Sequence, residues 1–191
     1  MRENRVKAKI REGKLAIGTY VGLADPALVE VIGLAGFDAA FIDTEHSAFD
    51  FKLVEEMIRA ADLVGITSIV RVPENNPKTF LRILDMGAQA IQVPHIKSRD
   101  DAIAAVKAMR YAPLGERGMA GASRASGYGT VSRAEHVVTC NSETMVIVMV
   151  EDQEAISDLE GIASVDGLDL VAWGRQICHS PWVFQIVVTR G

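Results

Sequence analysis

Short apolar runs alternate with helical patterns along most of this chain, and this alternation limits the fold more strongly than any other feature. The runs have the length and composition of strands that are buried on both faces of a sheet. They are LAIGTY (15–20), FDAAFID (37–43), TSIVRV (67–72), AIQVP (90–94), TMVIVMV (144–150) and LDLVA (168–172). Because strands and helices alternate, the sequence predicts an α/β fold with a parallel sheet.

Three of the intervening segments carry signals for the start, the end or the face of a helix. DPALVEVIGLAG places Asp25 at the capping position, Pro26 at the first helical position and Gly36 at the stop. FKLVEEMIRAADLVG and SRDDAIAAVKAMR repeat apolar residues three and four apart. The one long connection is the glycine-rich segment GERGMAGASRASGYG, and we expect a short strand at Arg117–Gly121 where it begins.

Two α/β architectures are compatible with this order, an open doubly wound sheet and a (β/α)8 TIM barrel. Gly18 and Gly22 are followed by LADP, so the glycine fingerprint of a dinucleotide site is absent after the first run. A complete barrel typically takes about 250 residues, and we count about seven strands in the 191 residues of this chain. The sequence therefore predicts a TIM barrel, residues 1–172, that is incomplete at its C-terminal end.

Composition excludes several classes of partner and compartment. Hydrophobic residues make up 49% of the chain, its net charge is -5, and its basic residues are scattered, so we expect one well-cored domain without nucleic-acid or membrane binding. No apolar run approaches the length of a membrane span, and MRENRVKAKIREGK lacks the apolar centre of a signal peptide. Cys140 and Cys178 show no metal or disulfide spacing, so we expect a cytoplasmic protein.

Polar side chains follow three of the expected strands at the point where each strand ends. Asp43, Glu45 and His46 end the second run, Arg71 lies at the end of the third, and Glu151 follows the TMVIVMV run. Because the carboxyl ends of barrel strands converge on the active-site face, these five side chains are the candidates for chemistry.

Each candidate has a functional and a structural interpretation. His46 has the side chain of a general base that works near neutral pH, or it is a hydrogen-bonded structural or surface histidine. Arg71 needs an anionic partner, which is either a substrate carboxylate or enolate, or an internal carboxylate such as Glu151. Glu151 is a metal ligand or the partner in that ion pair, and one carboxylate alone does not make a metal site.

Three stretches of the chain resemble the metal-dependent pyruvate aldolases of the 4-hydroxy-2-oxoheptanedioate aldolase (HpcH/HpaI) type. They are AGFDAAFIDTEHSAFD, RVPENNPKTFLRILDMGAQAIQVPHIKSRDDAIAAVKAMRYAPLGERG and VEDQEAISDLEGIASVDGLDLVA. The motifs occur in the family's order and spacing, and together they cover nearly everything up to residue 172. The resemblance implies a barrel of the phosphoenolpyruvate/pyruvate type and a homo-oligomeric protein, although the family's hexamers use C-terminal helices that this sequence lacks.

The resemblance also implies roles for individual residues. It makes His46 the base, Arg71 the residue that binds the pyruvate carboxylate and stabilises the enolate, and Glu151 a ligand of a divalent metal, Mg²⁺, Mn²⁺ or Co²⁺. It gives Asp85 the role of raising the basicity of the histidine. Asp85 precedes the fourth strand, at the wrong end of its own barrel, so we expect it to act across a subunit contact. Asp43 is the candidate within the chain for orienting His46.

The chain departs from the family at two places. Met149 stands where some relatives have a glutamine near the substrate, so that contact is not carried over to this chain. In the family, the strand that corresponds to LDLVA leads into GPADLS, whose aspartate is the second metal ligand. Here WGRQIC follows instead, and no carboxylate comes after Asp169.

The genetic code offers an explanation for this ending. Restoring one base before the Trp173 codon allows the following codons to spell GPADLSQSLGVP, so we interpret residues 173–191 as an aberrant tail produced by a frameshift. The alternatives are a divergent terminus and a new metal pair formed by Cys178 and His179. As written, the chain is expected to lack one metal ligand, the eighth strand and the closing helices.

These observations predict a carbon-carbon lyase that reversibly cleaves a 4-hydroxy-2-oxo acid to pyruvate and an aldehyde. No lysine ends an expected strand, which argues against an aldolase that forms an imine with its substrate. Two alternatives remain open. One is a CoA-ester lyase of the citrate lyase beta type, which shares the barrel and the metal, and the other is a truncated relative without activity.

Overall fold

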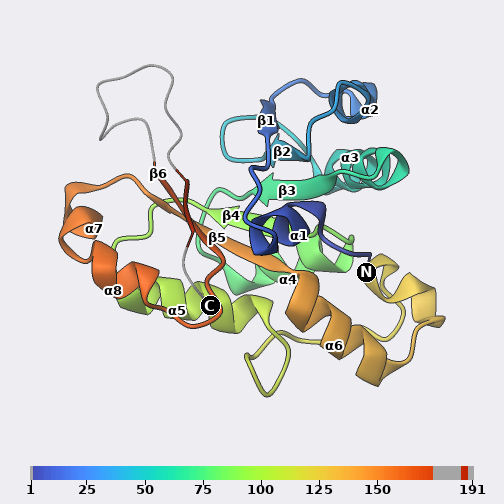
Figure 1. Ribbon diagram of the computed structural model, residues 1–191. Coiled ribbons are helices and arrows are strands. Elements are labelled where there is room, and N and C mark those ends of the chain that lie inside the picture. Colours follow the sequence, from blue (N-terminus) through green and yellow to red (C-terminus); the bar gives the residue numbers. More distant parts are fainter. Residues whose placement is uncertain (1, 174–185, 189–191) are drawn as a thin grey trace.

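A curled sheet of six parallel strands is the centre of the molecule in the computed structural model, which describes residues 2–173 and 186–188 (Figure 1). Neighbouring strands in the sheet are also neighbours in the sequence. The strands are β1 (Gly18–Val21), β2 (Ala39–Asp43), β3 (Thr67–Arg71), β4 (Ala90–Val93), β5 (Met145–Val150) and β6 (Leu170–Trp173). This order confirms the expected architecture, since the sheet is a half-barrel consistent with an incomplete TIM barrel.

Helices connect successive strands, as a parallel sheet requires, and one further helix, α1, precedes the first strand. They are α1 (Arg5–Arg11), α2 (Pro26–Leu34), α3 (Phe51–Val64), α4 (Pro77–Asp85), α5 (Arg99–Met109), α6 (Arg133–Glu143), α7 (Gln153–Ser157) and α8 (Leu159–Ala163), together with the 3₁₀ segment η1 (Arg124–Gly129). Within the described part of the chain, no helix is both long enough and apolar enough to cross a membrane.

The three helix signals of the sequence are confirmed. The Asp25 side chain caps α2 by accepting a hydrogen bond from the backbone N–H of Ala27, and Ser98 and Asp101 form a reciprocal capping box at the start of α5. Gly65 ends α3 with a φ of 74°, a left-handed conformation that glycine adopts without steric cost.

The strand expected at Arg117–Gly121 is wrong, because this segment is a loop. β4 pairs directly with β5, so the sheet has no position for a strand between them. The backbone N–H of Arg117 instead donates to the carbonyl of Arg110, at 2.9 Å, and its side chain is buried against Asp85 at the end of α4. Glycines in this segment also remove the side chains that a buried strand would pack.

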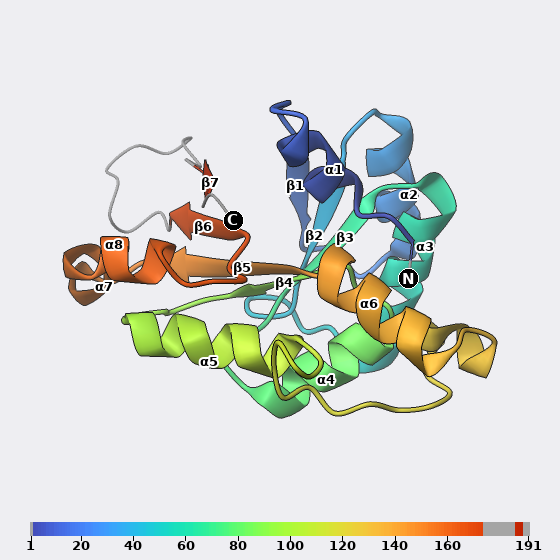
Figure 2. The same ribbon diagram turned by 60° about the horizontal axis from the view of Figure 1, so that its bottom comes forward.

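The two faces of the sheet carry separate apolar cores. The outer face packs against α2, α3, α4, α5, α7 and α8, which Figure 2 shows around the convex side of the sheet. The inner face forms a smaller cluster in the hollow of the half-barrel, which contains Val6, Ala39, Ile69, Ala90, Met145, Ile147, Met149, Leu170 and Ala172. Val6 belongs to α1, so this helix covers the hollow from the amino ends of the strands.

One further strand lies beside β6 and differs in direction from the rest. β7 (Ile186–Val188) pairs antiparallel with β6 in the register Leu170 to Val188. Of the tail expected at 173–191, only Trp173 and this strand are described, so Cys178 and His179 lie outside the described residues.

A matched pair of leucine substitutions tests the outer core. Leu84 is fully buried on α4, whereas Leu34 at the end of α2 is 80% exposed. We expect Leu84→Ala to lower the free energy of unfolding by about 2–5 kcal/mol, because it removes buried methyl groups and leaves a cavity. Leu34→Ala should change it by less than about 0.5 kcal/mol. Urea denaturation followed by circular dichroism measures both, and equal effects would contradict the assignment of the core.

Candidate active site

The carboxyl ends of β2, β3 and β5 bring the predicted side chains to one end of the sheet. Asp43 and Arg71 are the last residues of β2 and β3 and lie opposite each other in the strand register. Glu151 follows β5 directly, and Glu45 and His46 lie in the turn after β2. The convergence expected from the sequence is therefore present for these five residues.

Arg71 and Asp43 form a two-point ion pair at the centre of this site. Nε of Arg71 donates to Oδ1 of Asp43 at 2.9 Å, and Nη2 donates to Oδ2 at 2.6 Å. Glu45 adds a second negative charge, with Oε2 at 3.4 Å from Nε of Arg71. The internal partner of the arginine is thus Asp43, with Glu45, rather than Glu151. Nη1 of Arg71 has no hydrogen-bond partner in residues 2–173, so one nitrogen of the guanidinium is free to bind an anion.

Asp43 holds the backbone that carries His46 rather than the imidazole itself. Oδ1 of Asp43 accepts hydrogen bonds from the backbone N–H groups of Glu45, at 3.1 Å, and His46, at 3.3 Å. The His46 side chain is 70% exposed, and its Nε2 lies 3.8 Å from Oε2 of Glu45. The carboxylate beside the imidazole is therefore Glu45, and the role expected for Asp43 is limited in this structure to fixing the turn.

Glu45 and Glu151 are two carboxylates with little access to water. Their side chains are 10% and 15% exposed, and Oε2 of Glu45 and Oε1 of Glu151 are buried without a hydrogen-bond partner in the described residues. Burial raises the pKa of Glu151; the charge of His95 opposes this rise and that of Glu45 adds to it. Buried carboxylate oxygens without donors are the ligands that a hard divalent cation takes, so these residues fit such an ion.

The described residues do not complete a metal site by themselves. Among them, no group of three histidine, cysteine, aspartate or glutamate side chains is arranged to hold a metal ion. One or two carboxylates are nevertheless enough for a cation such as Mg²⁺ when water and substrate supply the other ligands. Glu151 is the candidate for one such carboxylate, and its role as a metal ligand stays a prediction.

Asp85 lies away from the other predicted residues. It ends α4, which precedes β4 and therefore lies toward the amino ends of the strands. Its Oδ1 accepts a hydrogen bond from Nη2 of Arg117 at 2.8 Å, and the Arg117 side chain is completely buried. Within one chain, Asp85 is thus not brought to His46, in agreement with the expectation that it sits at the wrong end of its own barrel.

His95 belongs to the site, although the sequence analysis did not select it. It follows β4, and its imidazole lies between two carboxylates, with Nε2 at 3.4 Å from Oε1 of Glu45 and Nδ1 at 4.0 Å from Oε2 of Glu151. The signal was available in the sequence, because His95 is the first charged or titratable residue after AIQVP and so ends a strand like the other candidates.

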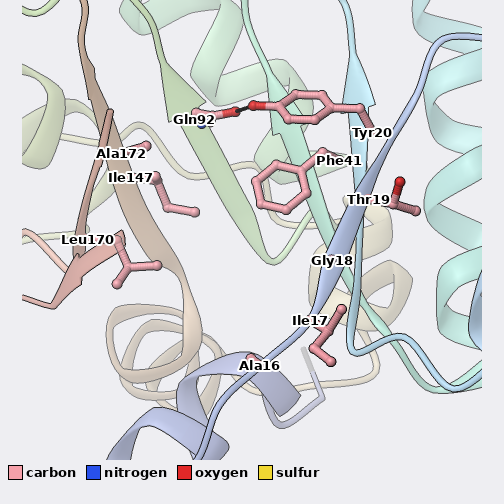
Figure 3. A pocket seen from close by; sticks show the side chains of 10 residues that line it. All are labelled: Ala16, Ile17, Gly18, Thr19, Tyr20, Phe41, Gln92, Ile147, Leu170 and Ala172. Atoms are coloured by element: carbon pink, nitrogen blue, oxygen red, sulfur yellow. Dashed lines mark hydrogen bonds between the residues drawn. The ribbon is translucent and has the colours of Figure 1, made fainter. Parts of the chain in front are cut away.

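A cavity of about 400 Å³ opens beside these residues in the hollow of the half-barrel (Figure 3). Its lining is mostly apolar, but Tyr20 and Gln92 point toward one another across it, and the Tyr20 hydroxyl donates to Oε1 of Gln92 at 2.7 Å. The Tyr20 ring stacks on Phe41 and also lies 4.8 Å from the guanidinium carbon of Arg71. The aromatic ring therefore supports the arginine from the cavity side.

The ion pair between Asp43 and Arg71 predicts a pH-dependent contribution to stability. Burial raises the pKa of Asp43, but the hydrogen bonds and the charge of Arg71 outweigh it, so the folded pKa lies below the ordinary value of about 4. The stabilisation is therefore present above pH ~4 and is lost as the pH falls through the folded pKa. We expect Asp43→Asn to cost about 1–3 kcal/mol at pH 7 and progressively less in acid. Urea denaturation at several pH values measures this, with the exposed Asp166→Asn as the control that should show no such trend.

Comparisons with known proteins agree with this fold. The HpcH/HpaI aldolase/citrate lyase family matches residues 16–176. The chain is 36% identical over 171 residues to a pyruvate aldolase of Rhizobium etli, covering 90% of this chain and 66% of the relative. It is 36% identical to a 4-hydroxy-2-oxovalerate aldolase of Novosphingobium aromaticivorans, covering 90% and 64%. The crystal structure of the citrate synthase SbnG matches with a TM-score of 0.80 and 34% identity, covering 89% of this chain and 65% of that one.

The chain thus spans about two thirds of the length of the curated relatives that it matches. The matched region contains all of β1 to β6 and every side chain of the site described above. On these grounds, the chain belongs to the HpcH/HpaI aldolase/citrate lyase family.

Proposed function

We propose that this protein is a class II aldolase that reversibly cleaves a 4-hydroxy-2-oxo acid to pyruvate and an aldehyde. The observation that carries the proposal is the meeting of Arg71, His46 and two largely buried carboxylates, Glu45 and Glu151, at one end of the sheet. An anion-binding group, an imidazole and a cation-binding carboxylate are what such a cleavage needs. The names of the two curated relatives, a pyruvate aldolase and a 4-hydroxy-2-oxovalerate aldolase, support the same substrate class.

Arg71 binds and orients the oxo-acid end of the substrate. Its free Nη1 donates to the carboxylate or to the oxygen that carries the negative charge of the enolate. Asp43 and the Tyr20 ring hold the guanidinium in place, so this donor is positioned before substrate arrives. A positioned donor stabilises developing charge without the cost of reorganising in the transition state.

His46 accepts the proton of the 4-hydroxyl group, directly or through a water molecule. As this O–H bond breaks, the bond between C3 and C4 also breaks, C4 leaves as the aldehyde carbonyl, and the electron pair stays on the pyruvate enolate. The enolate then takes a proton at C3 and becomes the methyl group of pyruvate. The exposed imidazole is accessible for both proton transfers.

Glu151 is the residue that would hold a divalent cation, Mg²⁺, Mn²⁺ or Co²⁺, together with water and substrate oxygens. When bound, such a cation supplies a Lewis acid that polarises the 2-oxo group. Asp85 would serve the site of a neighbouring subunit in a homo-oligomer. We further propose that residues 1–172 are the aldolase domain and that 173–191 is an aberrant tail without an independent domain.

The HpcH/HpaI aldolase/citrate lyase family includes citrate lyases, which favours one second candidate, a lyase of the citrate lyase type that acts on CoA esters. The two candidates differ in substrate, since one cleaves free 2-oxo acids and the other cleaves malyl or citramalyl thioesters. A relative without activity is the third outcome, and it would turn over neither class.

Removing Glu151 tests the cation site. We expect Glu151→Gln to weaken Mn²⁺ binding by at least about tenfold. Mutation of residues that merely hydrogen-bond to a metal ligand already lowers metal affinity by about 10–100-fold. Asp152→Asn is the matched control. Asp152 is the next residue in the sequence, but its carboxylate pairs with Lys97 at 3.6 Å. The affinity of this variant for Mn²⁺ should therefore stay close to that of the wild type. Isothermal titration calorimetry measures all three proteins. Equal affinity of the wild type and Glu151→Gln would exclude Glu151 as a ligand.

Removing the imidazole of His46 tests the base. His46→Ala should lower the rate of pyruvate release from a 4-hydroxy-2-oxo acid by about 10²–10⁴-fold, the usual contribution of a general base. The fold should be preserved because the side chain is exposed, which circular dichroism checks. A variant that releases pyruvate at the wild-type rate would rule out this mechanism.

A further inference from the structure

The backbone at His95 is held in an unusual conformation by its neighbours. Its φ is 54°, in the left-handed region that residues with a side chain rarely adopt. Val93 and Ile96 on either side are buried, and the backbone N–H of Ile96 donates to the carbonyl of Met149 at 3.2 Å. Strained residues of this kind persist where the surrounding structure fixes them, and they cluster at functional sites. The position of this side chain is therefore set by the fold.

The His95 imidazole lies on the solvent side of the two buried carboxylates. Its side chain is 57% exposed, against 10% for Glu45 and 15% for Glu151, although it is within 3.4 Å and 4.0 Å of their oxygens. The deeper groups, Arg71 and Glu151, are those that hold the oxo-acid end of the substrate in the proposed function. The aldehyde half then extends toward solvent, which brings it to His95.

The lysine that follows His95 in the sequence is not free to bind an aldehyde that carries a carboxylate. Glu45 and Glu151 face the imidazole, and two more carboxylates, Asp152 and Glu154, follow β5. Lys97 is the nearest lysine in the sequence, but it pairs with Asp152 at 3.6 Å and Glu154 at 3.9 Å. An imidazole can both donate and accept a hydrogen bond, and a hydroxyl group is the neutral partner that does the same.

We infer that His95 determines specificity for the aldehyde by hydrogen bonding to a hydroxyl group of a neutral hydroxyaldehyde. The inference rests on the proposed aldolase function and adds the class of the second substrate. In the synthetic direction, C3 of the pyruvate enolate forms a bond to the aldehyde carbon, and the aldehyde oxygen takes a proton to become the 4-hydroxyl. His95 contacts the neighbouring hydroxyl of the aldehyde and takes no part in this bond formation.

Three small aldehydes of similar size separate the possibilities. Glycolaldehyde carries a hydroxyl group, propanal carries a methyl group in its place, and glyoxylate carries a carboxylate. The full chain with Mn²⁺ and pyruvate is assayed with each aldehyde, and kcat/KM is compared between wild type, His95→Ala and His95→Asn. Asparagine tolerates the left-handed backbone and keeps a hydrogen-bonding group, so the second variant controls for a loss of local structure.

The expected result is a change in the selectivity between aldehydes in proteins that still form the enolate. His95→Ala should lower the ratio of kcat/KM for glycolaldehyde to that for propanal by about tenfold, the value of one hydrogen bond between partners in an active site. His95→Asn should retain part of the ratio. Exchange of the pyruvate methyl protons in D₂O without aldehyde, followed by NMR, should remain measurable in all three proteins, which shows that each still forms the enolate.

The other outcomes each overturn a defined statement. Exchange with an unchanged ratio in His95→Ala contradicts the role of His95 and leaves the aldolase function intact. A loss of activity confined to glyoxylate shows that the site takes an anionic aldehyde, which also contradicts the inference. The absence of proton exchange in the wild type overturns the proposed function. It also overturns the role of His95, because that role depends on the function.

Discussion

The pairing of Arg71 with Asp43 is the interaction on which the site depends. Both residues end neighbouring parallel strands, so the strand register alone places their side chains opposite each other. The pair neutralises a largely buried guanidinium, and the same Asp43 oxygen that accepts from Arg71 also accepts the backbone N–H groups of the turn that carries Glu45 and His46. One carboxylate therefore fixes the anion-binding group and the imidazole relative to each other.

The larger apolar core and the candidate active site lie on different parts of the sheet. Its convex face buries the larger apolar core beneath the helices, and this core forms without any contribution from the site. The concave face holds a smaller cluster, a cavity and the polar residues at the strand ends. Because burial of the outer core stabilises the fold, the strand ends can keep carboxylates whose oxygens lack hydrogen-bond partners in the described residues, an arrangement that costs stability unless a cation is bound.

The sequence was sufficient for the six parallel strands, for the helix caps and for five of the polar residues at the strand ends. Buried parallel strands are continuous apolar runs, and the residue after each run must lie at the carboxyl edge, so Arg71 and Glu151 could be selected without coordinates. The same reasoning failed at Arg117–Gly121, because a glycine-rich loop that begins with a buried arginine resembles a short strand locally. Selection by strand-end position also applies to His95, which follows Pro94. The sequence did not show, however, that two carboxylates lie beside its imidazole.

The amino-acid sequence by itself determined the α/β class, the family and the edge of the sheet that carries the candidate catalytic residues. Periodicity and strand-end position are local properties of the chain, so they can be read without coordinates. Only the tertiary structure decided which charges pair. The choice of Asp43 over Glu151 as the partner of Arg71, and of Glu45 over Asp43 as the carboxylate beside His46, depends on distances of a few ångströms between side chains from different strands. Those distances follow from sheet curvature and turn geometry, which no local pattern encodes.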